Sequence, residues 1–148
     1  MENRFAAAAT GALLAVAGLT ACSSPPSLPP QPPGALPPRT AHVTIDGQDA
    51  GTTHDVSCTQ VGWSNTFSTG DKDSGTTAVV NTGDQITAES VQIRNLNGFT
   101  GSFTAGTYGN AEATVAGQTF TITGTALGYT PDKPTNQVPQ HFTIKVSC

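Results

Sequence analysis

Apolar and polar residues alternate with a period of two through much of the chain, a pattern typical of half-buried β-strands. The alternation is clearest at residues 119–126, where every second residue is threonine and the residues between are Phe, Ile, Gly and Ala. It recurs in short runs at residues 42–46, 91–94, 111–115 and 142–146. No useful stretch shows the period of an amphipathic helix, so the pattern predicts strands and no helices after residue 40.

Short turn motifs separate these predicted strands. They are Asp46-Gly47, Thr82-Gly83-Asp84, Asn97-Gly98, Tyr108-Gly109-Asn110 and Ala116-Gly117. Short strands with frequent turns indicate an all-β fold, and we predict an antiparallel β-sandwich, with a barrel as the alternative. The longest irregular segment is expected between Gly128 and Gln140, because three prolines (Pro131, Pro134 and Pro139) fall within it.

The N-terminus has the organisation of an export signal. Arg4 provides a positive charge, and the apolar run Phe5–Leu19 follows it. A membrane-spanning helix needs about 20 apolar residues, and this run is shorter and ends in small residues and prolines. We therefore predict a cleaved signal peptide at residues 1–21.

The cysteine that ends this segment gives the signal a more specific meaning. Leu19-Thr20-Ala21-Cys22 matches the bacterial lipobox, in which the cysteine thiol receives a diacylglycerol and the signal is cut just before it. An ordinary secretory signal that contains a cysteine is the alternative. Each buried CH₂ adds roughly 0.8 kcal/mol, so a diacylglycerol and a further acyl chain such as palmitate on Cys22 would hold the protein on the membrane. The predicted partner of this end is membrane lipid, and the predicted location is the outer face of the cell membrane, in the cell envelope.

Residues 22–40 form a proline-rich linker between this cysteine and the predicted domain at residues 41–148. Ser23 to Thr40 contain eight of the 11 prolines in the chain. Such a segment favours an extended polyproline II conformation of about 3.1 Å per residue, so it predicts a disordered, stiff stalk. An SH3-type ligand is the alternative interpretation of these prolines.

Composition and charge exclude one class of partner. Only 11% of the residues are charged, against roughly 25% in an average soluble domain. The net charge of −4 argues against nucleic acid, which selects for basic surfaces.

The two remaining cysteines, Cys58 and Cys148, predict a disulfide, since an exported protein meets an oxidising compartment. Cys58 is in phase with Val56, and Cys148 is in phase with the apolar residues of 142–146, so both thiols are expected to point into the core. The bridge would close a loop of roughly 90 residues, worth about 4–5 kcal/mol in the chain-entropy model. Two free buried thiols are the alternative.

Candidate catalytic or metal-binding residues are few. His54-Asp55 has the residue types of a partial triad or a metal site, but no Gly-x-Ser-x-Gly, His-x-x-x-His or Cys-x-x-Cys motif accompanies it. A histidine at a strand end is the simpler interpretation. The segment Asp71–Gly75 is slightly similar to a calcium loop but lacks its glutamate, so a solvated turn is expected. Trp63 and Phe67 are expected on one face of a strand, in the core or at its rim, with ligand stacking as the alternative. We predict no catalytic site, no metal and no cofactor beyond the covalent lipid.

Taken together, the lipobox, the spacer and the rest of the chain resemble the mycobacterial 19-kDa lipoprotein antigen family, of the LpqH type. The matching stretches are residues 43–47, 56–58, 91–98 (VQIRNLNG), 109–114, 120–128 and 142–148. The resemblance implies a cell-envelope lipoprotein that host innate receptors recognise through its lipid, with no enzymatic activity. The spacer of that family is often rich in threonine and glycan-bearing, whereas this one offers only Ser23, Ser24, Ser27 and Thr40 as acceptors.

We therefore expect a membrane-anchored, non-enzymatic, antigen-like lipoprotein. The first alternative is a module that binds an apolar ligand such as a lipid, which requires a cavity lined by residues such as Phe99, Phe103 and Phe120. The second is an envelope hydrolase, which requires clustered acids or a nucleophile paired with a base.

Overall fold

The computed structural model of the protein describes residues 29–148, and the predicted signal peptide, Cys22 and the first part of the linker lie outside this range. The described chain is all-β and antiparallel, which confirms the predicted fold class. Its ten strands are β1 (Thr40–Ile45), β2 (Gln48–Thr53), β3 (Val56–Val61), β4 (Ser64–Gly70), β5 (Gly75–Thr82), β6 (Ile86–Leu96), β7 (Phe99–Thr104), β8 (Asn110–Ala116), β9 (Thr119–Thr130) and β10 (Lys133–Ser147).

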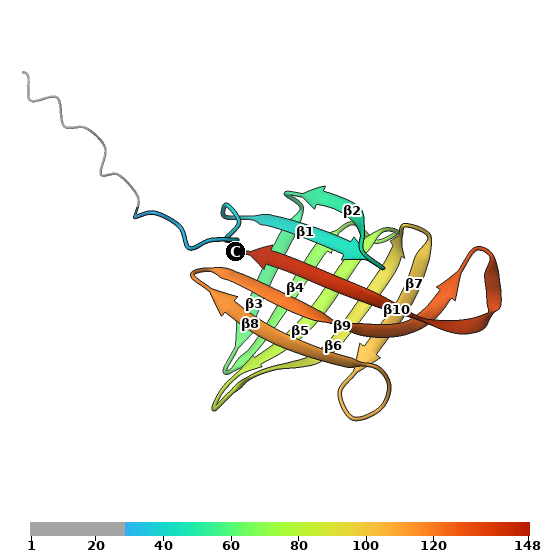
Figure 1. Ribbon diagram of the computed structural model, residues 1–148. Coiled ribbons are helices and arrows are strands. Elements are labelled where there is room, and N and C mark those ends of the chain that lie inside the picture. The colour runs from blue at the N-terminus through green and yellow to red at the C-terminus, as the bar shows by residue number, and fades with distance from the viewer. Residues whose placement is uncertain (1–28) are drawn as a thin grey trace, which may run out of the picture.

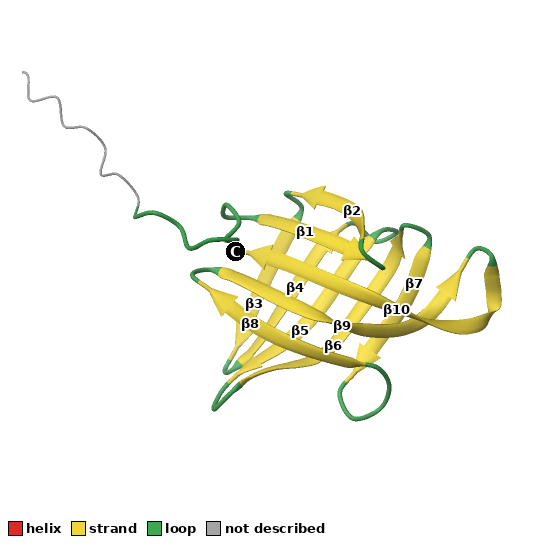
Figure 2. Cartoon of the chain, in the orientation of Figure 1, coloured by secondary structure: helices red, strands yellow, loops and turns green. Residues whose placement is uncertain are grey.

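All ten strands belong to one sheet that folds over itself into two layers. The strand order is β2-β1-β10-β9-β7-β6-β5-β4-β3, and β8 pairs with β9 off this path. Strands β2, β1, β10, β9 and β8 cross over the layer formed by β3 to β7 (Figures 1 and 2). Strand β9 joins the layers, because residues 119–125 pair with β8 whereas residues 127–129 pair with β7. The sandwich is therefore continuous along one side.

Most of the core consists of residues that the alternating pattern placed on one face of each strand, but Phe120 is only partly buried and Val115 is 42% exposed. On β9, Ile122, Gly124 and Ala126 are buried, and on β10 Phe142, Ile144 and Val146 are buried. The threonines of β9 lie on the other face, as predicted, but Thr119 is also buried. The linker covers it, since the backbone N–H of Leu36 donates a hydrogen bond of 2.8 Å to the hydroxyl of Thr119.

The five predicted turn motifs all lie at or beside junctions between successive strands. At the β6–β7 junction, Asn97 and Gly98 have φ angles of 50° and 77°. Positive φ at both central residues is the geometry of a type I′ turn, whose twist matches that of the flanking strands. The Asn-Gly pair thus fixes the register of this hairpin.

The prediction of an irregular segment at Gly128–Gln140 is wrong. Strand β9 continues to Thr130 and β10 begins at Lys133, so these residues form a hairpin that extends beyond the body of the sandwich (Figure 1). Strand β1 pairs with β10 only from Phe142 onward, so Lys133 and residues 138–140 pair with β9 alone, and residues 134–137 lie in an irregularity of that ladder. A proline is tolerated in a strand with a free edge, because its missing N–H removes no ladder hydrogen bond there.

Candidate functional site

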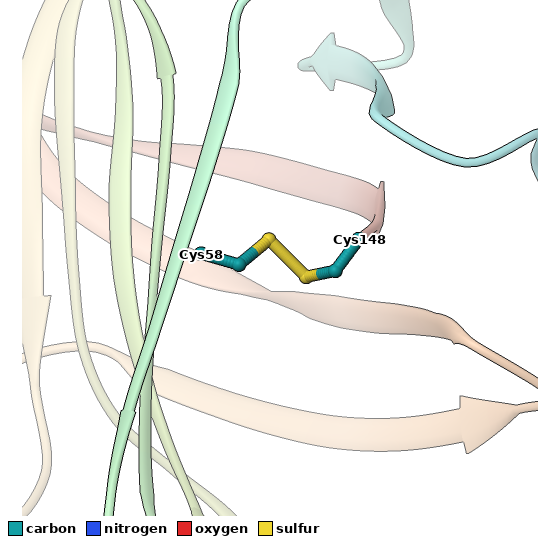
Figure 3. Close-up of a disulfide and its surroundings, with 2 residues drawn as sticks. All are labelled: Cys58 and Cys148. Atoms are coloured by element: carbon teal, nitrogen blue, oxygen red, sulfur yellow. A yellow bond between two sulfur atoms is a disulfide. The ribbon is translucent and has the colours of Figure 1, made fainter.

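A disulfide joins the two layers of the sandwich. It links Cys58 on β3 to Cys148, the residue after β10, with the two Cα atoms 6.1 Å apart (Figure 3). The predicted pairing is confirmed. The bridge fastens the end of β10 to β3, the last strand on the sheet path.

The predicted orientation of the two thiols into the core is wrong, because both cysteine residues are exposed. Val56 at the start of β3 is buried, but every later residue of that strand is exposed on both faces. Strand β3 has only β4 as a sheet neighbour. The alternation of residues along β3 therefore continues beyond Val56 without burial on either face. For this reason the position of Cys58 in the alternation does not indicate that it is buried.

An open groove of about 670 Å³ lies beside the disulfide, between β3, β4 and the hairpin of β8 and β9. We call it the disulfide groove. Its apolar wall consists of the disulfide, Phe67, Val115 and Phe120, and its polar rim consists of Thr59, Gln60, Asn65, Thr82 and Gln118. The rings of Phe67 and Phe120 are tilted at 42° with centroids 4.7 Å apart, which is a favourable arrangement for two aromatic side chains.

Three exposed apolar residues lie in the groove wall or on the β3–β4 hairpin that forms one of its sides. Val61 is 75% exposed, Trp63 is 68% exposed, and Val115 in the groove wall is 42% exposed. Trp63 lies in the turn between β3 and β4, so the prediction that it shares a strand face with Phe67 is wrong: Phe67 is buried and Trp63 is not. The carbonyl of Trp63 accepts hydrogen bonds of 2.8 and 3.1 Å from the backbone N–H and the hydroxyl of Thr82, a rim residue.

The linker passes the same groove. A Cβ atom placed on Gly117, in the groove lining, would lie 3.5 Å from the ring of Pro32. The hydrogen bond from Leu36 to Thr119 holds the following residues against the start of β9. The linker and the C-terminal end of β10 accordingly lie side by side in Figure 1.

The three phenylalanines predicted to line an apolar cavity occupy different places. Phe99 is 1% exposed and belongs to the core. Phe103 lines a second open cleft of about 690 Å³, between the start of β6, the β7–β8 connection and β8. Phe120 lines the disulfide groove. The second cleft also contains Glu89 and Glu112, whereas no side chain that lines the disulfide groove is charged.

The structure places His54 beside a buried hydroxyl and engages the backbone of Asp55 in a local turn contact. The ring Nδ1 of His54 lies 3.2 Å from the hydroxyl of Thr40, and the backbone N–H of Asp55 donates to the hydroxyl of Thr53. Elsewhere, His42 and the carboxylate of Asp49 form a surface contact of 3.2 Å. Within residues 29–148 no group of three or more His, Cys, Asp or Glu side chains is placed to hold a metal ion.

The segment Asp71–Gly75 forms the tight turn between β4 and β5. The backbone N–H groups of Ser74 and Asp73 each donate a 2.8 Å hydrogen bond to the carboxylate of Asp71. These two bonds hold the pKa of the Asp71 carboxyl below its usual range, because they favour the charged form. The carboxylate of Asp71 thus accepts hydrogen bonds from backbone N–H groups of the same turn, which agrees with the interpretation of a solvated turn.

No helix that is long and apolar enough to cross a membrane occurs in the part of the chain that the structure describes.

Comparison with known proteins reveals similarity along the whole chain. Residues 34–148 match the family described as Mycobacterium 19 kDa lipoprotein antigen. A chain named as a lipoprotein from Mycobacterium avium subsp. hominissuis is 42% identical over 149 residues, covering all of this chain and 97% of that one. The lipoprotein LppE of Mycobacterium tuberculosis is 36% identical, with both chains covered in full. The lipoprotein LpqH of M. tuberculosis is 35% identical over 161 residues, covering all of this chain and 99% of its own.

Proposed function

Because the chain belongs to the Mycobacterium 19 kDa lipoprotein antigen family, we propose that acyl chains on Cys22 anchor it to the outer face of the cell membrane and that host innate receptors bind this acylated end. The domain at residues 41–148 is then a non-enzymatic unit displayed in the envelope.

The observation that carries the proposal is the full-length similarity to proteins named as lipoproteins. The alignments with LppE and LpqH cover all of this chain, including its first 28 residues, and not the β-sandwich alone. The lipobox at residues 19–22 supplies the chemistry, since a cysteine thiol is the nucleophile that lipid attachment needs. Two or three acyl chains together exceed the marginal membrane affinity of one chain, because each buried CH₂ contributes about 0.8 kcal/mol.

The structure supports a division between a lipid end and a protein end. Strand β1 begins at Thr40, and the linker is fixed to the sandwich from Leu36 onward by the bond to Thr119. The chain before Pro32 therefore spans the distance between the domain and Cys22. Pro32 is ten positions after Cys22, which corresponds to about 31 Å in a polyproline II conformation. The domain is thus held close to the membrane.

A non-enzymatic role agrees with the surroundings of the candidate catalytic pair. His54 faces the hydroxyl of Thr40, which is itself buried at the start of β1. A hydrolase needs its base beside an accessible nucleophile.

Replacing the proposed acylation site tests the anchor. Cys22→Ala should abolish lipidation, so the protein should remain unprocessed or be released into the medium, while Ser23→Ala should stay membrane-bound and serve as the matched control. The measurement is partition into the detergent phase together with the intact mass of the purified protein. The anchor assignment fails if the Cys22→Ala protein still partitions into detergent after its signal has been removed.

A further inference from the structure

We propose that the disulfide groove binds one acyl chain of a lipid from the membrane to which the protein is anchored. The membrane partner rests on the proposed function, whereas the groove itself is a property of the folded domain. The groove's wall, its rim, its surroundings and its distance from Cys22 all point to this ligand.

The wall of the groove suits a hydrocarbon chain. Its accessible apolar groups are the ring of Phe120, which packs on the buried ring of Phe67, the side chain of Val115 and the disulfide, and none of its lining side chains is charged. Its volume of about 670 Å³ falls within the range of roughly 300–1,000 Å³ found for small-molecule sites. Phe120 and Val115 remain partly accessible in the folded domain, so apolar surface is available for burial when a chain enters.

The rim suits the polar end of a neutral lipid. Amide side chains of Gln60, Asn65 and Gln118 stand with the hydroxyls of Thr59 and Thr82 around the apolar wall. An apolar cleft with a small number of polar groups at its edge is the usual organisation of a ligand site. The second cleft lacks this character, because the carboxylates of Glu89 and Glu112 lie in its lining.

The surroundings of the groove suit a membrane surface. Five large hydrophobic side chains of the described residues are exposed: Val115 lines this groove, and Val61 and Trp63 lie on the β3–β4 hairpin whose strands form one of its sides. Tryptophan favours the interface between lipid and water, where its ring is buried and its N–H stays hydrated. The backbone carbonyl of Trp63 accepts hydrogen bonds from the side chains of Thr82 and Asn65, which both line the groove.

The path of the linker places the groove within reach of lipid. Pro32 packs on Gly117 at the groove, and the ten positions back to Cys22 correspond to about 31 Å in a polyproline II conformation. Tethering at this distance raises the local concentration of membrane lipid around the groove without any further contact.

The test uses the processed chain beginning at residue 22 with Cys22→Ala, so its result does not depend on whether the native cysteine is acylated. The probe is stearoyl lysophosphatidylcholine below its critical micelle concentration, with glycerophosphocholine as the control without an acyl chain. Equilibrium dialysis should give saturable binding of one lipid per chain and no binding of the control. A probe brominated at mid-chain should also quench Trp63, which is the only tryptophan in the protein.

Two matched variants locate the binding. Val115 and Tyr129 are both 42% exposed, but only Val115 lines the groove. Val115→Lys should weaken lipid binding at least tenfold, and Tyr129→Lys should leave it unchanged. Thr59→Lys, a substitution of an exposed rim residue on β3, should repeat the loss without disturbing β8.

Three outcomes would overturn the proposal. The first is the absence of saturable binding, and the second is binding by both lysine variants of the groove with wild-type affinity. The third is binding by the Cys22→Ala chain but not by the acylated protein, which would identify the protein's own acyl chain as the occupant. None of these outcomes affects the anchor assignment, which the partition of Cys22→Ala tests separately.

Discussion

Two regions of the sandwich, the middle of the covering layer and the edge strand β3, are held in place in different ways. In the centre of the covering layer, β10 lies between β1 and β9, and alternate residues of its second half, such as Ile144 and Val146, are fully buried. At the edge of the other layer, β3 has one sheet neighbour and buries only Val56. Packing therefore stabilises the first region, whereas a covalent bond holds the second. A groove with apolar walls remains open where the two layers separate.

Removing the disulfide should produce the largest loss of stability. Cys58→Ser combined with Cys148→Ser leaves two exposed hydroxyls and no buried polar group, so the loss should reflect the freed chain, at about 4 kcal/mol of unfolding free energy. Denaturant unfolding measures this loss, and reduction of the wild-type protein should reproduce it. Amide exchange should rise more in β3 than in the centre of β10. A double variant within about 1 kcal/mol of wild type would mean that packing alone holds β3.

Valine-to-alanine substitutions on β10 and on β3 should have unequal effects on stability. Val146→Ala removes two methyl groups from a fully buried site and should cost about 2 kcal/mol, from lost transfer energy and the cavity left behind. Val61→Ala on β3, where the side chain is 75% exposed, should change stability by less than about 0.5 kcal/mol. Denaturation midpoints of the two variants provide the comparison. Equal losses would show that β3 is covered in solution.

The contact between linker and domain should contribute least. Thr119→Val removes the acceptor of the Leu36 N–H and should cost about 1 kcal/mol, with faster amide exchange at Leu36. Thr121→Val, two residues along the same strand, is the control and should leave Leu36 protected. If Leu36 exchanges slowly in Thr119→Val as well, another contact fixes the linker.

The sequence predicted the parts of this fold that depend on local pattern. Alternation identified the strand that contains residues 119–126, and the Asn97-Gly98 pair identified the turn between β6 and β7, because local sequence alone favours these conformations. The pairing of Cys58 with Cys148 followed from the export signal. None of these predictions requires knowing which strands pack over one another.

The errors arose where burial depends on the arrangement of the layers. The phase of Cys58 placed it in the core, but the residue is exposed on β3, which has β4 as its one sheet neighbour. Pro134 and Pro139 indicated a loop, although an irregularity of the β9–β10 ladder accommodates Pro134 and a free strand edge accommodates Pro139. The disulfide groove itself was missed, because its walls come from β3, β4 and the β8–β9 hairpin, which the sequence could not bring together. That Trp63 is exposed and lies beside Thr82 is apparent only from the three-dimensional structure.

The assignment of host recognition to the acylated end is tested most directly by separating lipid from protein. A synthetic peptide of residues 22–27 with acylated Cys22 and the folded, disulfide-bonded chain with Cys22→Ala are compared with the native protein at equal molarity in a receptor reporter assay. The acylated peptide should give most of the native signal, since a receptor that binds acyl chains gains about 0.8 kcal/mol for each buried CH₂. The lipid-free chain should be nearly inactive. A lipid-free chain that signals as strongly as the native protein would place recognition in the sandwich and contradict the account.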